Sequence, residues 1–420
     1  MSLEEWRQAI TSPPAYRLGN STLRFQTKYV VLVFVFTIVC VLYIMLPTGG
    51  GTNNSNTNSI DSSTDRKFSN VISNGDVGGK KASILFGTKI TKSQYNDAYP
   101  LTKPVSTEKG LRYNIGIISD LDVDSKTGGG KWVSYFRRGY LFLQLNAHSP
   151  KLSKVSVEWD SGEPHTIKSG LSLDSRGMEL SELVAFNGKL YTCDDRTGVI
   201  FEVPFSDTAT DVQPIPWVIL ADGNGTSPKG FKCEWATVKD EHLYVGGLGK
   251  DWTTPEGEYV NYNPQFVKKI SASGEVSHLN WRPNYQKISS EMGIHFPGYV
   301  VHESAGWSSV MKKWMFLPRR ASNEKYNDKT DERKGTNMMV YADEDFSNVK
   351  VATVGEIIPT HGFSSFKWIP GTDDALVVAL KSEEIEGKTA TYIMVFDMEG
   401  NILLPETKVG DHKYEGIEFI

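Results

Sequence analysis

The stretch Lys232–Gly249, KCEWATVKDEHLYVGGLG, places two short β-strand patterns around a polar turn, and the chain repeats this plan. Two close copies are GMELSELVAFNGKLYTCDDRTG from Gly177 and VHESAGWSSVMKKWMFLPRR from Val301. A looser copy, GFSSFKWIPGTDDALVVALK, begins at Gly362, and the final YEGIEFI starts like another. Such a unit buries its faces only against neighbouring units, so the repeats predict a closed ring of antiparallel sheets.

The copies share a polar residue near the start of the first strand. Aligned on that strand, these residues are spaced by 53, 69, 61 and 51 positions, and they are Ser181, Glu234, Glu303, Ser364 and Glu415. The chain after Ala82 would give five units of roughly 67 residues, enough for four-stranded blades with long loops. We therefore predict an all-β, five-bladed β-propeller over residues 82–420. The final YEGIEFI should complete the sheet begun near Tyr113 and remove exposed edges.

The shared polar positions also predict a site. If the first strands line the axis, three carboxylates and two hydroxyls meet there, and a cation is needed to offset their repulsion. Oxygen donors favour a hard ion such as calcium. The alternative is that each residue is an ordinary solvated residue at the end of a strand. Recurrence of a polar residue at the same position of each repeat weakens this alternative.

Composition excludes one class of partner. The 420 residues carry a formal net charge of −5 with a pI near 6.0, so nothing in the charge balance suggests nucleic-acid binding. The 38 glycines and 11% aromatic residues favour a turn-rich β protein.

The amino-terminal region predicts a membrane anchor. Residues 29–46, YVVLVFVFTIVCVLYIML, contain no charge and have about the minimum length for a spanning helix. Arg and Lys precede this segment and are absent after it until Arg66, so residues 1–28 should be cytosolic in a type II arrangement. A cleaved signal peptide, followed by secretion, is the alternative.

Residues 47–81 are rich in Gly, Asn, Ser and Thr and should form a flexible stem. Glycosylation sequons begin at Asn53 and, within a predicted turn, at Asn224. Pairing of Cys193 with Cys233 stays open on sequence grounds.

Charged residues at strand exits suggest chemistry. Asp120, Asp122 and Asp124 alternate after an apolar run, and in an extended chain they would project to one side, able to hold a metal or a water. A solvated strand exit is the alternative. Arginines follow two strands, and guanidinium groups match phosphate oxygens, so acidic metal ligands facing a cationic loop would suit metal-assisted phosphoryl chemistry. The cationic candidates are Arg176, Arg196, Arg319, Arg320, Arg333 and Lys334.

The chain resembles the calcium-activated nucleotidase, or calcium-dependent apyrase, family. The resemblance rests on stretches that include YNIGIISDLD, GMELSELVAFNGKLY with DDRTG, KGFKCEW, PGYVVHESAGWS, FLPRRAS, PTHGFSSFKW and YEGIEFI, in order over residues about 85 to 420. It implies an enzyme that hydrolyses nucleoside di- and triphosphates. The implied fold is a five-bladed propeller with a calcium ion on its axis.

The resemblance also implies residue roles. The calcium shell would be Ser181, Glu234, Glu303, Ser364 and Glu415, the positions that the repeats share. Asp120, Glu179 and Asp195 would be the catalytic carboxylates, which the sequence does not rank. Substrate contacts are assigned to Asp122, Arg176, Arg196, Trp235, Arg319 and Arg320.

The resemblance further implies an endoplasmic reticulum or Golgi lumenal enzyme that prefers UDP, GDP and UTP to ADP and ATP, with homodimerisation as a family-level expectation. Two other classes remain open. One is a propeller that binds calcium only for stability, and the other is a lactonase-type or esterase-type hydrolase, which would place a histidine such as His302 or His361 near the metal.

Overall fold

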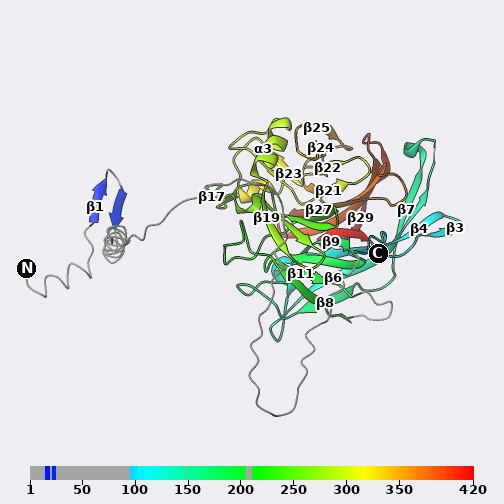
Figure 1. The fold of residues 1–420 in the computed structure, drawn as a ribbon, viewed down its shortest axis with the longest axis horizontal. Coiled ribbons are helices and arrows are strands. Elements are labelled where there is room, and N and C mark those ends of the chain that lie inside the picture. Colours follow the sequence, from blue (N-terminus) through cyan, green and yellow to red (C-terminus); the bar gives the residue numbers. More distant parts are fainter. Residues whose placement is uncertain (1–14, 19–20, 25–94, 147, 205–210) are drawn as a thin grey trace, which may run out of the picture. The chain divides into compact units, whose positions relative to one another are not determined.

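The computed structural model describes residues 15–18, 21–24, 95–146, 148–204 and 211–420 (Figure 1). The chain divides into two compact units, Met1–Gly87 and Thr88–Ile420. In the first, the described strands β1 (Ala15–Leu18) and β2 (Ser21–Arg24) form an antiparallel pair. The predicted anchor at 29–46 and the predicted stem at 47–81 lie outside the described residues, as do Cys40 and the Asn53 sequon. Among the helices that the structure describes, none is long and apolar enough to span a bilayer.

Four antiparallel sheets of four strands each make up most of the second unit. The first contains β9 (Leu180–Phe186), β10 (Lys189–Asp194), β11 (Val199–Glu202) and β13 (Ile215–Ile219). The second contains β14 (Trp235–Lys239), β15 (His242–Gly246), β18 (Phe266–Ser271) and β19 (Val276–Asn280). The third contains β21 (Ala305–Ser308), β22 (Lys313–Phe316), β24 (Met338–Asp343) and β25 (Val349–Thr353). The fourth contains β26 (His361–Trp368), β27 (Leu376–Ile385), β28 (Lys388–Asp397) and β29 (Ile402–Gly410).

Tight turns explain why the repeats form hairpins. Asn187 and Gly188 join β9 to β10 with φ angles of 50° and 74°, which is the left-handed pair that a two-residue hairpin turn requires. Asp240 and Glu241 play the same part between β14 and β15, with φ angles of 50° and 58°. The local sequence therefore sets the strand register of each unit.

A further sheet has eight strands and includes the carboxyl-terminal strand. Its strands are β3 (Val105–Thr107), β4 (Gly110–Ser119), β5 (Lys126–Thr127), β6 (Lys131–Gln144), β7 (Lys154–Trp159), β8 (His165–Ser169), β12 (Asp211–Val212) and β30 (Tyr414–Phe419). Strand β30 pairs antiparallel with β4, and Ile417 lies opposite Ile117. The prediction that YEGIEFI completes the sheet near Tyr113 is confirmed.

The first strands of the sheets contact one another in a ring. Strand β30 contacts β9, β9 contacts β14, β14 contacts β21, β21 contacts β26, and β26 contacts β30. This is a β-propeller-like arrangement, as predicted. The prediction of five four-stranded blades is not borne out, because only four of the described sheets have that form and the remaining position is occupied by a strand of the eight-stranded sheet.

Short elements fill the loops between sheets. They are β16 (Trp252–Thr253), β17 (Tyr259–Asn261), β20 (Tyr299–Val301), β23 (Arg320–Ser322), α3 (Arg282–Glu291), α4 (Asp328–Asp331) and the 3-10 turns Asp122–Ser125, Pro150–Leu152 and Asn263–Gln265. The first of these turns corrects the prediction for Asp120, Asp122 and Asp124. The chain leaves β4 at Ser119 and bends, with φ of 48° at Asp122, so the three side chains do not form an extended comb.

Hydrophobic side chains fill the spaces between adjacent sheets. One cluster joins Phe186 and Tyr191 of the first sheet to Ala236 and Leu243 of the second. The same cluster contains Cys193 and Cys233, which are both buried and free of a disulfide. Asn224 is exposed in a turn, where its Oδ1 accepts a hydrogen bond from Thr226 Oγ1 at 2.7 Å.

We expect ring closure to depend on the apolar face of β30. Ile417 is fully buried against residues of β4 and β27, so Ile417→Ala should lower the free energy of unfolding by about 2–5 kcal/mol. Ile402→Ala, at a side chain that is 40% exposed, should change it by about 0.5 kcal/mol or less. Denaturant unfolding measures both variants, and equal stability of the two would contradict the closure described here.

Candidate functional site

The five residues predicted from the repeats occupy equivalent places on the ring. Ser181, Ser364 and Glu415 lie within β9, β26 and β30, while Glu234 immediately precedes β14 and Glu303 lies two residues before β21. Each is at most 7% exposed. Because the five inner strands contact one another in sequence, these side chains gather at one end of the ring's centre.

Cationic side chains neutralise the carboxylates of this central group. Arg319 donates through Nη1 to Glu303 and to Glu415, the latter at 2.8 Å, and its Nη2 lies 3.4 Å from Glu384. Lys232 Nζ lies 2.9 Å from Glu234 Oε1. Arg319, which was predicted as a substrate contact, has a side chain that is 6% exposed and lies among the acidic groups.

Burial dominates the acid–base properties of the central glutamates. It raises the pKa of Glu234 to about 8, although the neighbouring Lys232 ammonium opposes the rise. Burial also raises the pKa of Glu415 well above its usual range, against the effect of Lys413 and Arg319. For both groups, burial opposes the ionised form and nearby positive charge favours it.

Two central hydroxyls lack partners. Ser181 Oγ and Ser364 Oγ are buried and make no hydrogen bond with the described residues. An unpaired buried polar atom is costly, and most such atoms in folded proteins bind water or an ion. Unpaired oxygens beside acidic groups fit a hard, oxygen-preferring cation.

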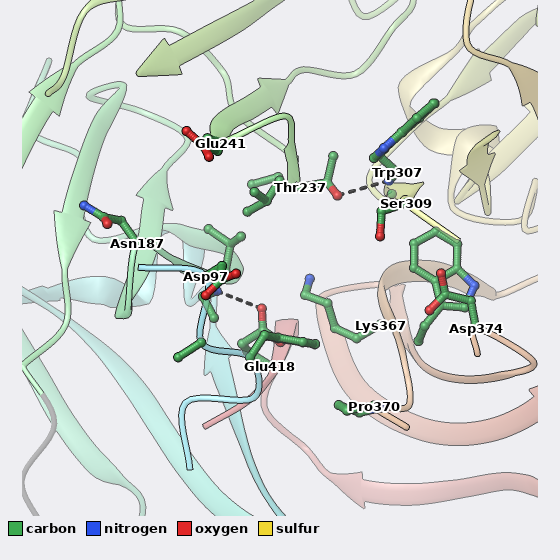
Figure 2. Close-up of a pocket in the computed structure, with 18 of the residues that line it drawn as sticks. Asp97, Asn187, Thr237, Glu241, Trp307, Ser309, Lys367, Pro370, Asp374 and Glu418 are labelled. Atoms are coloured by element: carbon green, nitrogen blue, oxygen red, sulfur yellow. Dashed lines mark hydrogen bonds between the residues drawn. The ribbon is translucent and has the colours of Figure 1, made fainter. Parts of the chain in front are cut away.

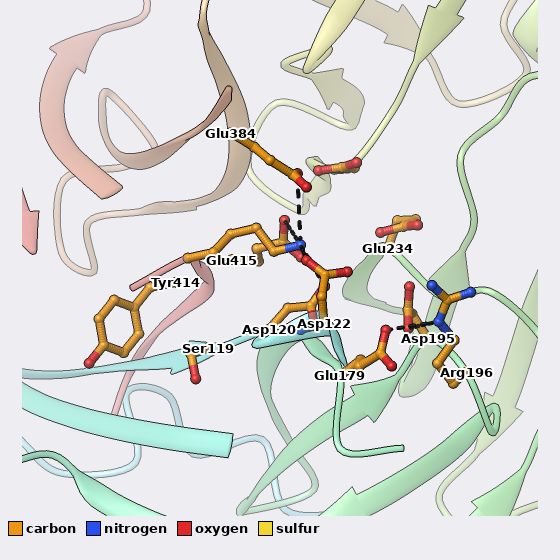
Figure 3. A network of polar contacts seen from close by, with 12 residues as sticks. Ser119, Asp120, Asp122, Glu179, Asp195, Arg196, Glu234, Glu384, Tyr414 and Glu415 are labelled. Atoms are coloured by element: carbon orange, nitrogen blue, oxygen red, sulfur yellow. Dashed lines mark hydrogen bonds and ion pairs between the residues drawn. The ribbon is translucent and has the colours of Figure 1, made fainter. Parts of the chain in front are cut away.

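A second acidic group adjoins the first. Asp120, Asp122 and Glu179 each present an oxygen within 4.8 Å of the others, and among the described residues they form an acidic trio close enough to bind one ion (Figure 3). Lys413 Nζ bridges two of them, at 2.9 Å from Asp120 Oδ2 and 2.5 Å from Asp122 Oδ2. The trio and the central group share Lys413, which also lies 3.9 Å from Glu415.

Two arginines hold Glu179. Arg176 donates through Nε to Glu179 Oε1 at 2.7 Å and through Nη2 to Oε2 at 2.5 Å, and Arg196 Nε reaches Oε2 at 2.8 Å. The two arginine side chains are 31% and 29% exposed, whereas Glu179 is fully buried. Their outer faces are therefore accessible to an anionic ligand.

The pKa values of the neighbouring acids shift in opposite directions. Burial opposes ionisation of Asp120, but Lys413 and the backbone N–H of Asp122 outweigh it and hold the pKa of Asp120 below its usual range. Burial, with Asp195 and Asp120 nearby, raises the pKa of Glu179. Asp120 is thus ionised at neutral pH.

Asp195 joins the same network, whereas Arg320 and Trp235 have other partners. Arg320 pairs with Asp331 at 2.6 Å, and Asp195 contacts Lys232 and, at 3.7 Å, Arg196. Trp235 is fully buried and packs against Trp281 with ring centroids 5.8 Å apart, so no ligand reaches its ring in this structure. Asp124 is exposed and does not join the acidic trio.

The histidines beside the central positions face other partners. His302 is fully buried with its ring 5.1 Å from that of Tyr285, and burial lowers its pKa to about 3. His361 Nδ1 lies 2.7 Å from Glu406 Oε2. The expectation that a lactonase-type site would bring a histidine to the central group finds no support in these contacts.

Sequence analysis missed Lys232, Lys413 and Glu384. Lys232 precedes Glu234 by two residues, and Lys413 precedes Glu415 by two, as Glu179 precedes Ser181. Side chains two apart on an extended strand point to the same side. The repeats therefore contained a signal for these lysines, because a second polar residue stands two positions before three of the five central residues.

A cavity of about 450 Å³ lies at the other ends of the inner strands, where Ala185, Thr237, Trp307, Lys367 and Glu418 line it (Figure 2). None of the predicted site residues lines this cavity. The candidate site is therefore confined to the end of the ring at which the inner strands begin.

Comparison with known proteins shows the family to which the chain is related. The sequence profile of the apyrase family matches residues 121–420. The chain is 54% identical to soluble calcium-activated nucleotidase 1 of Rattus norvegicus over 329 residues, which cover 78% of this chain and 79% of that protein. It is 46% identical to an apyrase of Cimex lectularius over 341 residues, covering 80% and 91%. A hypothetical selenium-binding protein from Sulfolobus tokodaii has a TM-score of 0.33 and 10% identity, covering 74% and 62%, too distant a likeness for any inference.

The ring of sheets and its acidic centre define a propeller-like β protein with a polar axial site. The chain belongs to the apyrase family, as the sequence analysis predicted from its motifs.

Lys413 should stabilise the site in a pH-dependent way. Its side chain is 6% exposed, and Lys413→Met would leave Asp120 and Asp122 without their ammonium partner, at a cost of about 3–5 kcal/mol in unfolding free energy near pH 7. Lys413 lowers the pKa of Asp120 in the folded state. The stability that this pair contributes is therefore fully present above the pKa of an unfolded aspartate, about 3.9, and is lost as the pH falls through the lower pKa of Asp120 in the folded protein.

Denaturant unfolding at pH 7 and at lower pH tests this expectation. The difference between parent and variant should shrink as the solution becomes more acidic. Lys109→Met, which removes an exposed pair with Glu158, serves as the control and should cost about 1 kcal/mol or less. A deficit for Lys413→Met that grows on acidification would refute the assignment.

Proposed function

We propose that this protein is a calcium-dependent hydrolase of nucleoside di- and triphosphates that prefers UDP, GDP and UTP to ADP and ATP. The observation that carries the proposal is the combination of buried, unpartnered hydroxyls at Ser181 and Ser364 with a central set of acidic side chains and adjoining, partly exposed arginines. The names of the relatives, calcium-activated nucleotidase and apyrase, support the same activity.

The central group is the proposed calcium site. Its residues are Ser181, Glu234, Glu303, Ser364 and Glu415, which supply only oxygen donors. Bound calcium would supply positive charge that neutralises phosphate and the acidic centre. It would also offset the burial that favours the neutral forms of Glu234 and Glu415.

Cationic side chains are proposed to bind the phosphates. Arg176 and Arg196 expose part of their guanidinium groups while Glu179 fixes their positions, so Glu179 acts as a positioning residue. Guanidinium groups bind phosphate oxygens in paired hydrogen bonds. Arg319 adds positive charge at the central group, and Lys413 adds positive charge between the acidic trio and Glu415.

Asp120 is proposed to orient the attacking water. Lys413 keeps its carboxylate ionised, so it can accept a hydrogen bond from water at neutral pH. The Asp120 carboxylate is a weak base, so it suits the positioning of the water more than its complete deprotonation. The acceleration of hydrolysis would then come chiefly from placement of the water and neutralisation of the phosphate charge. Asp195, held by Lys232, remains a candidate for the same role.

The finer architecture and location are part of the proposal. We take the eight-stranded sheet, with β30 innermost, as the fifth blade, since β30 occupies the ring position between β26 and β9. We also propose that residues 29–46 anchor the protein with residues 82–420 in the endoplasmic reticulum or Golgi lumen, and that it removes nucleotide products of glycosyl transfer. The apolar run of residues 29–46 and the basic residues that precede it support this orientation.

Substitution of the central glutamates should weaken calcium binding. In Glu234→Gln and Glu303→Gln, one negative charge is lost from the proposed shell, so the calcium concentration for half-maximal UDP hydrolysis should rise about tenfold or more. Calorimetric calcium titration should show the same loss without substrate. Glu275→Gln, at an exposed turn position, is the matched control.

If both variants keep full activity at low calcium, the ion does not bind at the central group. Loss of calcium binding in Asp120→Asn alone would instead assign the ion to the acidic trio. Calcium and nucleotide binding without phosphate release would favour a binding module over an enzyme.

Replacement of Asp120 should lower the rate more than the affinity. Asp120→Asn keeps the shape of the side chain but removes the charge that orients water, so kcat should fall about 10²–10⁴-fold with a smaller change in KM. Asp124→Asn, on an exposed side chain four residues along the chain, should stay within about twofold of the parent. Release of phosphate from UDP under saturating calcium provides the measurement, and equal rates for the two variants would remove Asp120 from the mechanism.

A further inference from the structure

A cavity of about 650 Å³ opens among the loops that follow β15 and β19. Its walls come from the β16–β17 hairpin, from helix α3 and from the loops that contain Phe296 and Tyr326. Contacts join these walls: Asp328 N donates to Pro255 O at 3.0 Å, and Lys325 Nζ lies 2.5 Å from Glu258. The cavity is therefore framed by segments that hold one another in place.

Gln265 presents an unused acceptor on the cavity wall. The residue is 5% exposed, and its Nε2 donates to Asp251 Oδ1 at 2.8 Å. An ionised carboxylate only accepts, so this contact fixes the orientation of the amide and leaves Oε1 as an acceptor. Gln265 Oε1 is buried and makes no hydrogen bond with the described residues. A ligand with an N–H or O–H group would satisfy it.

Aromatic side chains surround the opening. Phe296 is 88% exposed and Tyr259 is 54% exposed, and both line the cavity with Tyr326. Lys250 Nζ lies 4.2 Å from the centre of the Tyr326 ring and donates to the backbone oxygen of Asp251 at 3.1 Å. Exposed rings next to polar donors and acceptors suit a planar, polar aromatic ligand, since stacking and hydrogen bonding then act together.

Two segments lead from the cavity to the central group. Tyr299 and Val300 of β20 line the cavity, and Glu303 lies four residues after Tyr299, a path of roughly 13 Å at the rise of an extended chain. Gly246 O accepts the N–H of Glu234 at 2.8 Å, and Gly249 and Lys250 of the following segment line the cavity. A nucleoside with two phosphates can bridge such a span.

The cavity wall is also linked to the segment that contains Arg319 and Arg320. Tyr299 donates through its hydroxyl to Asp331, whose other oxygen accepts from Arg320 Nη1 at 2.6 Å. Arg320 follows Arg319, the cation between Glu303 and Glu415. Side-chain hydrogen bonds therefore connect the cavity wall to Arg320, the sequence neighbour of Arg319.

We propose that this cavity binds the nucleoside end of the substrate, with Phe296 and Tyr259 stacking on the base and Gln265 Oε1 accepting a hydrogen bond from one of its N–H groups. The proposal rests on the nucleotide hydrolysis put forward above and adds the subsite that recognises the base. Uracil and guanine can present a ring N–H to Gln265 Oε1, whereas adenine can present only its exocyclic amino group, so we expect Gln265 to influence the base preference.

Phe296→Ala and Gln265→Met test the subsite. Phe296 is largely exposed, so its replacement should leave folding intact, and methionine preserves the length of Gln265 without its acceptor. For each variant we expect the KM for UDP to rise about tenfold, while the inhibition constant of inorganic pyrophosphate against UDP hydrolysis changes less than about twofold. Ile219→Ala, another exposed apolar residue, serves as the control.

Uridine, which has no phosphate, tests the cavity by itself. Nuclear magnetic resonance should detect uridine binding to the parent protein and a weaker interaction in Phe296→Ala. Unchanged KM values and unchanged uridine binding in both variants would overturn the proposal while leaving the hydrolase assignment standing. A parent protein that binds uridine but releases no phosphate from any nucleotide would instead refute the proposed function and retain the subsite.

Discussion

The structure depends on the compensation of acidic charge at the centre of the ring. Inner strands from different sheets bring Glu234, Glu303 and Glu415 into a buried region, where like charges repel strongly and solvation is poor. Arg319 and Lys232 supply opposite charge from within the fold. A ring of sheets could close around apolar residues at lower electrostatic cost, so the retained acidic centre is best understood as a binding site.

The layered arrangement of polar groups links that centre to the proposed chemistry. In the segments that lead into the inner strands, Lys232 lies beside Glu234 and Lys413 lies near Glu415, each two residues earlier in the chain, and Glu179 likewise precedes Ser181 by two residues. The inner layer holds the oxygens proposed to bind calcium, and the next holds the charges that organise Asp120 and the exposed arginines. The residues proposed for binding and those proposed for catalysis are therefore close together, and Lys413 lies near members of both groups.

The sequence predicted the repeats, the alignment of the five central residues and the pairing of β30 with β4. The repeats follow from strand periodicity and turn residues that are local in the chain, whereas the pairing was predicted from the need to close the ring with a final partial repeat. Prediction from the sequence failed where tertiary contacts decide. The turn at Asp122 prevents the aspartates after β4 from projecting to one side of an extended chain, as had been predicted. Trp235, predicted as a substrate contact, is buried in the core. The uneven partition of strands into an eight-stranded sheet depends on edge pairings of β3, β5, β7 and β12, which short strand patterns do not specify.

The pairing of β30 with β4 has a kinetic consequence. Ile417 and Ile117 are partners across the sheet although 300 positions separate them in sequence, and contacts of such separation form slowly because a long loop must close first. Glu415 reaches the centre only through that strand. During refolding, the sheets built from adjacent hairpins would gain their structure early, and the capacity to bind an ion would emerge with the slowest, most cooperative phase.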